Sequence, residues 1–227
     1  MAEATFHKST LREYFESIVV AVILALFIRT FVVQAFKIPT GSMEPNLLVG
    51  DHLLVNKFIF APAASRLERL VLPMREIRRG DVIVFKFPEE PERDFIKRGI
   101  GLPGDTIELR QRQLYVNGIK QDEAYAHYLF PQGEGDESTV FDVRERYGPV
   151  TVPADHFFMM GDNRDNSQDS RYWGFLPAHY VKGRALMIYW SFEPPPGEQQ
   201  AGLPGLVSSL GSIVTSTRWT RLLHQIH

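Results

Sequence analysis

A continuous apolar stretch near the N-terminus constrains this chain more than any other feature of its sequence. Residues 18–36 read IVVAVILALFIRTFVVQAF, and only Arg29, Thr30 and Gln34 among these nineteen residues are not apolar. A helix of that length is roughly 28 Å long, about the thickness of one hydrocarbon core. We therefore predict a single transmembrane helix at residues 18–36, preceded by a short cytoplasmic segment at residues 1–17.

The charges beside this stretch predict its orientation. Lys8 and Arg12 precede it, whereas Lys37 alone follows it closely, so the N-terminus is expected inside and the body of the chain outside. Two alternatives stay open, a buried helix of a globular protein and a signal peptide that is cleaved between Ala35 and Phe36. Acidic residues near the start of the stretch and an arginine inside it favour an uncleaved anchor.

The rest of the chain alternates short strand-like runs with turn residues. Residues 82–87 (VIVFKF) and 181–192 (VKGRALMIYWSF) are strong strand patterns, and Asn117-Gly118 is typical of a hairpin tip. No alternation of strands and helices suggests a parallel sheet. We predict a mostly β fold, in which an antiparallel β core at residues 37–106 and 153–192 contains a smaller inserted β subdomain at residues 107–152.

The C-terminal tail, residues 193–227, is predicted to hold a stiff proline-rich linker and a short basic helix. Three prolines at 194–196 stiffen the linker, and no acidic residue occurs after position 198. Four apolar residues share one helical face, namely Trp219, Leu222, Leu223 and Ile226. The sequence leaves open whether this helix lies on an anionic membrane surface or packs on the body.

Composition excludes several classes of function. Lysine and arginine number 25 against 27 acidic residues, so no chain-wide nucleic-acid footprint is present. The chain has no cysteine, which excludes disulfides, thiolate zinc sites, iron–sulfur clusters and a cysteine nucleophile. The acidic loop at 162–169 fails the calcium-loop pattern, and the glycines at 99–105 lack phosphate-loop spacing. We expect no metal and no cofactor.

Ser42 and Lys97 are the candidate nucleophile and base. Ser42 lies in the stiff turn PTGSMEP, six residues after the apolar stretch, where the turn would stand at a membrane surface. Lys97 lies among apolar neighbours in FIKRGIG, and burial costing roughly 3 kcal/mol would lower its pKa from ~10.4 to about 8. A structural turn serine and a solvated edge-strand lysine are the alternative interpretations.

A third polar segment, GDNRDNSQDSR at residues 161–171, supplies possible support. Its paired acids and arginines can brace one another into a rigid loop, and a hydroxyl such as that of Ser167 can orient an uncharged lysine amine. An exposed polar loop is the alternative. Together with IPTGSMEPNLLVGDHLLV, RRGDVIVFKFP and FIKRGIGLPGD, this segment resembles bacterial type I signal peptidase, or leader peptidase, a family of Ser–Lys dyad proteases.

The resemblance implies a serine endopeptidase that removes signal peptides from exported preproteins. Ser42 would then be the nucleophile, Lys97 the general base and Ser167 the residue that positions the lysine. The Ser42 N–H and the Thr40 hydroxyl would form the oxyanion hole, although relatives often have serine where this chain has Thr40. The residues that match the family's bracing loop are Asp162, Arg164, Asp169 and Arg171.

The resemblance also implies the substrate, the partners and the location. An extended preprotein would add a strand to an exposed sheet edge, beside shallow apolar pockets that select small side chains. The candidate pocket residues are Phe36, Ile38, Pro39, Met43, Val84, Phe95 and Ile96. We expect signal peptides and membrane lipid as partners, no nucleic acid, and a monomer at the bacterial inner membrane with its catalytic domain on the outer face.

Other classes of protein remain as alternatives. A self-cleaving repressor-type protease shares the Ser–Lys chemistry, but it would need a DNA-binding domain in place of the apolar stretch. A membrane-anchored β module that only binds envelope proteins fits the anchor and the loops. Burial of the Lys97 amine beside the Ser42 hydroxyl separates these alternatives, because a binding module has no reason to bury that amine.

Overall fold

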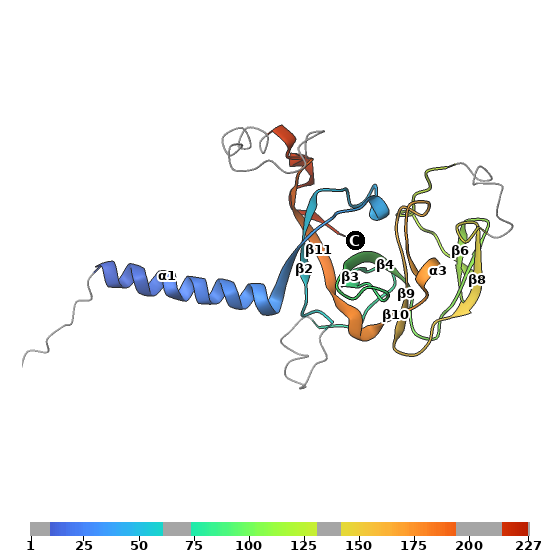
Figure 1. The fold of residues 1–227 in the computed structure, drawn as a ribbon, viewed down its shortest axis with the longest axis horizontal. Coiled ribbons are helices and arrows are strands. Elements are labelled where there is room, and N and C mark those ends of the chain that lie inside the picture. Colours follow the sequence, from blue (N-terminus) through green and yellow to red (C-terminus); the bar gives the residue numbers. More distant parts are fainter. Residues whose placement is uncertain (1–9, 61–73, 131–141, 194–214, 227) are drawn as a thin grey trace, which may run out of the picture.

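The computed structural model describes residues 10–60, 74–130, 142–193 and 215–226 (Figure 1). Most of these residues belong to antiparallel strands, which form one large and one small sheet. The predicted mostly β fold is therefore confirmed. A single long helix precedes the strands and projects away from the body that they form (Figure 1).

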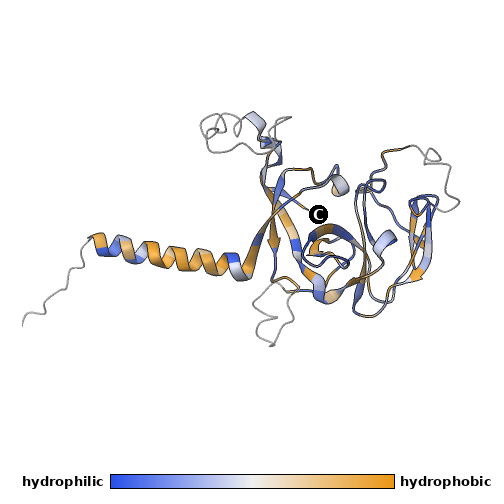
Figure 2. Ribbon diagram, viewed as in Figure 1, coloured by the Kyte–Doolittle hydropathy of each residue, from blue (hydrophilic) through white to orange (hydrophobic). Residues whose placement is uncertain are grey.

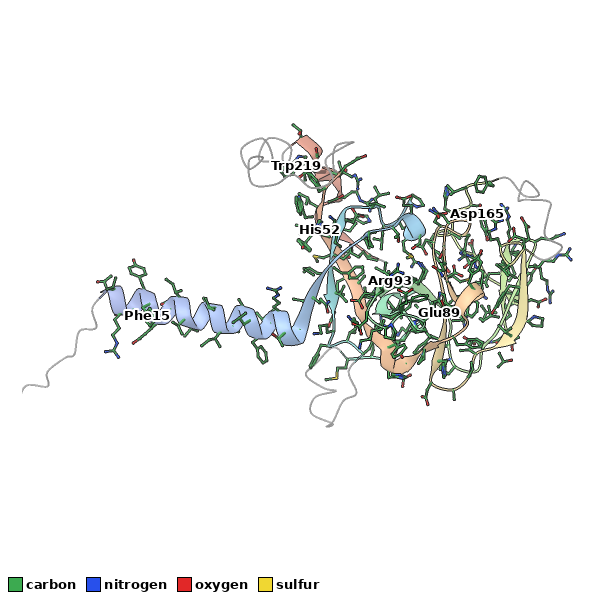
Figure 3. The ribbon with its side chains drawn as sticks, in the orientation of Figure 1. Phe15, His52, Glu89, Arg93, Asp165 and Trp219 are labelled. Carbon is green, nitrogen blue, oxygen red and sulfur yellow. The ribbon has the colours of Figure 1, made fainter. Side chains whose placement is uncertain are left out.

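Helix α1 spans Thr10–Phe27 and continues as a π-helix, η1, at Ile28–Val32. No residue of α1 is buried, and Figure 2 colours most of its ribbon as hydrophobic. Phe15, for example, keeps 67% of its surface exposed and lies far from the strands (Figure 3). Within the described ranges, none of the helices combines the length and the apolar character that a membrane crossing requires.

The end of the predicted helix at residues 18–36 is wrong. Strand β1 begins at Val33 and ends at Lys37, and it pairs antiparallel with β2 in the register Val33↔Asn56 to Lys37↔His52. The β-branched Val33 suits an extended backbone, and main-chain bonds to a neighbouring strand replace those of a helix. The apolar run therefore contains a helix followed by a strand.

The large sheet holds eight strands in the order β1-β2-β11-β3-β4-β9-β10, with β12 beside β11. Burial alternates along β2, as the period of a strand with one covered face requires. The other bounds are Asp51–Asn56 for β2, Val82–Lys86 for β3, Asp94–Gly101 for β4, His156–Met160 for β9, Leu176–Pro177 for β10, Val181–Ser191 for β11 and His224–Gln225 for β12. This sheet carries the segments that the sequence analysis selected.

The small sheet has the order β7-β6-β5-β8. Its strands are β5 (Thr106–Arg110), β6 (Gln113–Val116), β7 (Ile119–Lys120) and β8 (Arg146–Thr151). The predicted hairpin tip at Asn117-Gly118 is confirmed, because Val116 pairs with Ile119 and both tip residues have positive φ angles of 53° and 76°. Figure 1 shows this sheet at the end of the molecule opposite α1.

The predicted C-terminal helix is wrong for residues 219–225. A 3-10 turn at Trp219–Arg221 leads into β12, which pairs with β11. Ile226 is buried in the core at 7% exposure, whereas Trp219 and Leu223 are 60% and 70% exposed. Pairing with β11 gives the main-chain N–H and C=O groups of this segment their hydrogen bonds without a helix. The apolar spacing therefore did not indicate a helical face. The described part of the tail packs on the body, and residues 194–214 lie outside the described ranges.

Candidate active site

Ser42 lies in a tight turn between β1 and β2. The turn contains a short 3-10 helix at Gly41–Met43, and Ser42 and Met43 are both buried. We call residues 39–50 the Ser42 turn. Two main-chain bonds close it at its ends, from the Ile38 N–H to the Asp51 carbonyl (2.8 Å) and from the Gly50 N–H to the Ile38 carbonyl (3.0 Å). The hydroxyl is therefore held on a rigid loop.

The structure brings Lys97 and Ser42 together. Lys97 lies in β4, paired with Ile83, and its amine Nζ donates a hydrogen bond to Ser42 Oγ at 2.5 Å. The lysine keeps only 4% of its surface exposed. Burial lowers the pKa of Lys97 to about 8, although the carboxylates of Asp169 and Asp162 act to raise it. Near neutral pH a fraction of the molecules therefore has an uncharged Lys97 amine, which is able to accept a proton.

Ser167 lies beside the same turn. It is 6% exposed, and its hydroxyl makes no hydrogen bond of good geometry with any described residue. A Cβ at Gly161 would overlap both Ser167 Oγ and the Ser42 carbonyl oxygen, so glycine is what allows these groups to approach each other. The structure thus places Ser167 near Ser42, but it records no bond from Ser167 to the Lys97 amine.

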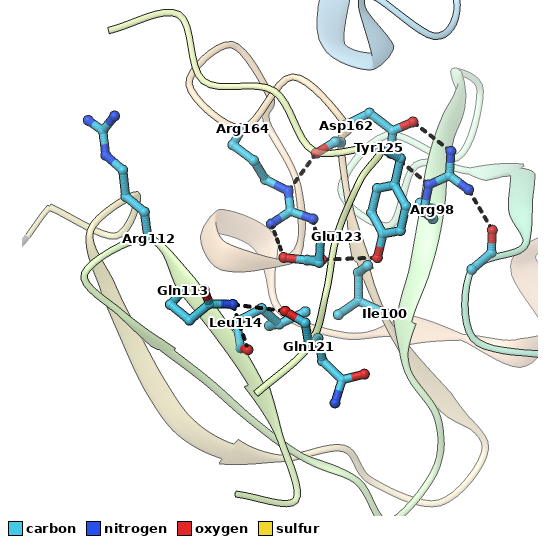
Figure 4. A network of polar contacts seen from close by, with 12 residues as sticks. Arg98, Ile100, Arg112, Gln113, Leu114, Gln121, Glu123, Tyr125, Asp162 and Arg164 are labelled. Atoms are coloured by element: carbon cyan, nitrogen blue, oxygen red, sulfur yellow. Dashed lines mark hydrogen bonds and ion pairs between the residues drawn. The ribbon is translucent and has the colours of Figure 1, made fainter. Parts of the chain in front are cut away.

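Asp162 is held by a buried bidentate ion pair. Both of its oxygens lie 2.7 Å from the Arg98 guanidinium (Figure 4). Asn46 Nδ2 also donates to Oδ2 at 2.8 Å. Arg98 also covers the ring of Tyr125, 4.2 Å from its centroid. Asp162 is fully buried, so this pair holds the start of the 161–171 loop against β4.

Arg164 is held in the same network by Glu123. Its Nη1 and Nη2 atoms donate to the two carboxylate oxygens at 2.8 and 2.5 Å, and Nε donates to the Gly161 carbonyl at 3.1 Å (Figure 4). Burial acts to lower the pKa of Arg164, but Glu123 raises it above its ordinary value. The guanidinium therefore stays charged and fastens the loop to residues 121–128.

Asp169 and Arg171 form the third pair. Arg171 Nε and Nη2 each lie 2.8 Å from an Asp169 oxygen, and Nη2 also donates to the Arg164 carbonyl at 2.7 Å. Burial acts to raise the pKa of Asp169, but Arg171 and the Gly161 N–H hold it below its ordinary value. All four residues that were predicted to brace the loop are thus buried and paired.

The predicted pocket residues are divided between the core and the surface. Ile38, Met43, Val84 and Ile96 are core residues with at most 4% exposure. The other three keep open surface, since Phe36 and Phe95 are half-buried and Pro39 is exposed. Thr40 is exposed as well, in an extended backbone just before the 3-10 helix. The four core residues offer little surface to a ligand.

Sequence reasoning missed the residues that hold the Ser42 turn from behind. The Asp51 carboxylate is fully buried and accepts from Arg221 Nη2 (2.6 Å), Ser191 Oγ (2.6 Å) and the Leu48 N–H (2.8 Å). Arg221 also donates to the Asn46 carbonyl at 2.8 Å. The basic residues of the tail indicated that it could pair with acidic side chains. Arg221 is 170 residues from Asp51 in the sequence, however, so no local pattern predicts this pair.

Arg98 and Glu123 were missed too. Arg98 directly follows Lys97 in the same strand, among the same apolar neighbours, and this position was the sequence signal that it could be buried too. Glu123 stands in a polar stretch without strand or helix periodicity, so nothing local distinguished it. In the described residues, no cluster of three or more histidine, aspartate or glutamate side chains is arranged to hold a metal ion.

Comparisons with known proteins show the family to which this chain belongs. The family model described as "Signal peptidase, peptidase S26" matches residues 11–190. The signal peptidase I of Pseudomonas aeruginosa is 38% identical over 213 residues, which cover 81% of this chain and 74% of that protein. The signal peptidase I of Aquifex aeolicus is 33% identical over 233 residues, and the match covers 82% of this chain and 86% of that protein.

A solved structure of a signal peptidase I from Enterococcus faecalis is 33% identical and covers 48% of this chain and 97% of its own, with a TM-score of 0.39. The family match extends over most of the chain, from α1 to β11, and includes the Ser42 turn, β4 and the 161–171 loop. The identity to the curated relatives spreads over four fifths of the chain. The chain therefore belongs to the signal peptidase I family of serine peptidases, peptidase S26.

Proposed function

We propose that this protein is an endopeptidase that removes N-terminal signal peptides from exported preproteins, with Ser42 as nucleophile and Lys97 as general base. The observation that carries the proposal is the buried Lys97 amine, 2.5 Å from the Ser42 hydroxyl. Burial has a cost for a lysine, and no carboxylate hydrogen-bonds to this amine in the described residues. The lowered pKa suits a base that works near neutral pH.

The chemistry would proceed in two halves. Neutral Lys97 accepts the Ser42 proton as Oγ attacks the scissile carbonyl, and the Ser42 N–H and Thr40 hydroxyl stabilise the oxyanion. Lys97 then donates its proton to the leaving amine and activates a water molecule for deacylation. Ser167, beside the turn, would orient the amine once a substrate excludes water. The three ion pairs of the 161–171 loop would keep that hydroxyl in place.

A free edge of β4 would receive the substrate. Residues 94–97 of β4 pair with β3 on one side, whereas pairing with β9 on the other side starts only at Arg98. An extended peptide can therefore add its main chain along Phe95 and Ile96 and end at Ser42. Phe36, Pro39 and Phe95 keep surface for its side chains, while Ile38, Met43, Val84 and Ile96 would form the floor beneath them.

We propose that α1 and η1 anchor the protein to the bacterial inner membrane, with the catalytic body on its outer face. A largely apolar helix with no buried residue needs an apolar surrounding, which the other described residues do not provide. The large sheet would be the catalytic core and the small sheet the inserted subdomain, in a chain that acts as a monomer. A binding module without catalysis is the alternative, and it leaves the buried lysine unexplained.

Replacement of the nucleophile tests the proposal. The variant Ser42→Ala, compared with wild type in detergent on one purified preprotein, should lose cleavage by at least about 10⁴-fold, because the lysine then has no hydroxyl to activate. Its thermal unfolding should be that of wild type. A Ser42→Ala protein that still cleaves at the wild-type rate would contradict the proposal, and so would a wild type that leaves every preprotein uncut.

A further inference from the structure

A cavity of about 620 Å³ borders the Ser42 turn on the side that continues toward β2. Its lining includes Glu44 and Pro45 of the turn, His127 and Asn163, and Glu193 and Arg218 near the C-terminus. Figure 1 shows this part of the chain, just after β1, next to the loop that follows β9, whose Asn163 N–H bonds to the Ser42 carbonyl. The cavity includes none of the residues that we assigned to catalysis.

Asn163 connects the cavity to the nucleophile. Its N–H donates to the Ser42 carbonyl and its Nδ2 to the Gly41 carbonyl, each at 3.1 Å. The side chain is 1% exposed, and its carbonyl oxygen Oδ1 is buried without a hydrogen-bond partner in the described part of the chain. A buried acceptor without a donor is unfavourable, so a ligand group that donates an N–H to Asn163 Oδ1 would be stabilised here.

Glu44 supplies a negative charge at the same place. Its carboxylate folds back over the turn, and Oε2 lies 2.7 Å from the position that a Cβ on Gly41 would take. Among the described residues the Glu44 carboxylate has neither a hydrogen bond nor an ion pair. A half-buried carboxylate beside an unpaired amide oxygen favours a cation that donates hydrogen bonds.

The other charges of the cavity are already used. Arg218 lies 3.2 Å from the Glu193 carboxylate and donates to the Val49 carbonyl at 3.1 Å and to Ser191 Oγ at 3.3 Å. His127 is exposed, and its N–H and carbonyl both bond to the 161–171 loop. Apart from the exposed His127 ring, the unpaired groups that remain are the Glu44 carboxylate and Asn163 Oδ1, which are acceptors, so the cavity favours positive charge.

The position of the cavity relates it to the part of a substrate after the cut. Under the proposed function, on which this inference rests, the residues before the cut lie along β4 and residues 36–40. The enzyme's own chain passes Ser42 and continues to Glu44, on the side of Ser42 away from residues 36–40. Substrate residues after the cut would therefore meet that side of the turn. We infer that Glu44 and Asn163 form a subsite for a lysine or arginine side chain among the first residues of the released protein.

The test uses peptides with one signal-peptide sequence and a glutamine, lysine or glutamate at each of the first four positions after the cut. With the full-length protein in detergent, lysine should be preferred over glutamate by about 3- to 10-fold in kcat/KM at one position, which corresponds to a single partly exposed charge pair. Glu44→Gln should remove this preference and Glu44→Lys should reverse it. Glu76→Gln, an exposed glutamate at another cavity, should keep it.

Equal discrimination in wild type and Glu44→Gln would overturn the inference, and so would the absence of charge discrimination at every position. A salt series in wild type gives a second readout that needs no variant, because the preference should shrink between about 0.05 M and about 0.5 M salt. A preference that ignores salt would also count against a charge pair. Loss of all cleavage of the glutamine peptide by wild type would instead contradict the proposed function.

Discussion

Two neighbouring residues of β4, Lys97 and Arg98, carry buried cations into two differently built regions. Each residue is 4% exposed. The amine of Lys97 meets a neutral hydroxyl, that of Ser42, whereas the guanidinium of Arg98 meets both oxygens of the Asp162 carboxylate. Burial is the same in the two regions, and the direct partner is different.

The partner decides what each cation does. A carboxylate in direct contact compensates the desolvation of the Arg98 guanidinium, so this region holds the fold together. Lys97 receives only the more distant fields of Asp169 and Asp162, and burial prevails, with a pKa of about 8. The lysine region is therefore costly to the fold and useful to chemistry, and the arginine region is the reverse.

The largest expected effect tests whether the uncharged amine matters. Lys97→Arg keeps a cation and its donors but cannot lose its proton, because a guanidinium stays protonated throughout the pH range in which proteins are folded. We expect kcat/KM for preprotein cleavage to fall by about 10⁴-fold at every pH. Lys86→Arg, an exposed lysine of β3, is the matched control and should change little. Substantial activity in Lys97→Arg would remove the distinction between the two regions.

A second variant breaks the arginine region. Arg98→Met leaves the fully buried Asp162 carboxylate without its ion-pair partner, so we expect a loss of about 3–5 kcal/mol in the free energy of unfolding. Denaturant unfolding at pH 7 measures it. The exposed Arg93, paired with Glu90, provides the control Arg93→Met, which should lose less than about 1 kcal/mol. Similar losses in both variants would refute a structural role for the buried pair.

A third variant tests the cost of the lysine region. The lowered pKa of Lys97 means that below about pH 8 the folded state holds a desolvated charge, at a cost of about 3 kcal/mol. Lys97→Met should therefore be more stable than wild type at pH 7, by up to that amount. Between about pH 8 and the ordinary lysine value the unfolded state binds more protons, so wild-type stability rises and the gap closes. A gap that does not change with pH would contradict this account.

Much of this architecture could be predicted from local sequence, for physical reasons. Strands β3 and β11 follow from dense apolar and β-branched runs, and the Asn117-Gly118 tip follows from the positive φ angles that these residues tolerate. Ser42 and Lys97 could be selected because few residue types supply a nucleophile and a tunable base. Their 2.5 Å contact could not be derived, since it joins residues 55 positions apart.

The parts that sequence reasoning mispredicted depend on tertiary pairing. Residues 33–37 continue an apolar helix in composition but form β1, because β2 offers them a main-chain partner. Residues 224–225 lie inside the segment whose apolar spacing predicted a helix, but they pair with β11. The partners of Arg98 and Arg221 lie 64 and 170 residues away, so no local pattern reveals them. The polar support of the site is therefore mostly a property of the fold.

Direct titration of the Lys97 amine tests the central claim most directly. The ε-carbon resonances of labelled lysine, recorded against pH in the intact protein in detergent, identify Lys97 by the signal that Lys97→Met removes. The account predicts a pKa of about 8 for this amine. A value at or above about 10, the ordinary range of a solvated lysine, would contradict the account, because the amine beside Ser42 would then be fully charged at neutral pH.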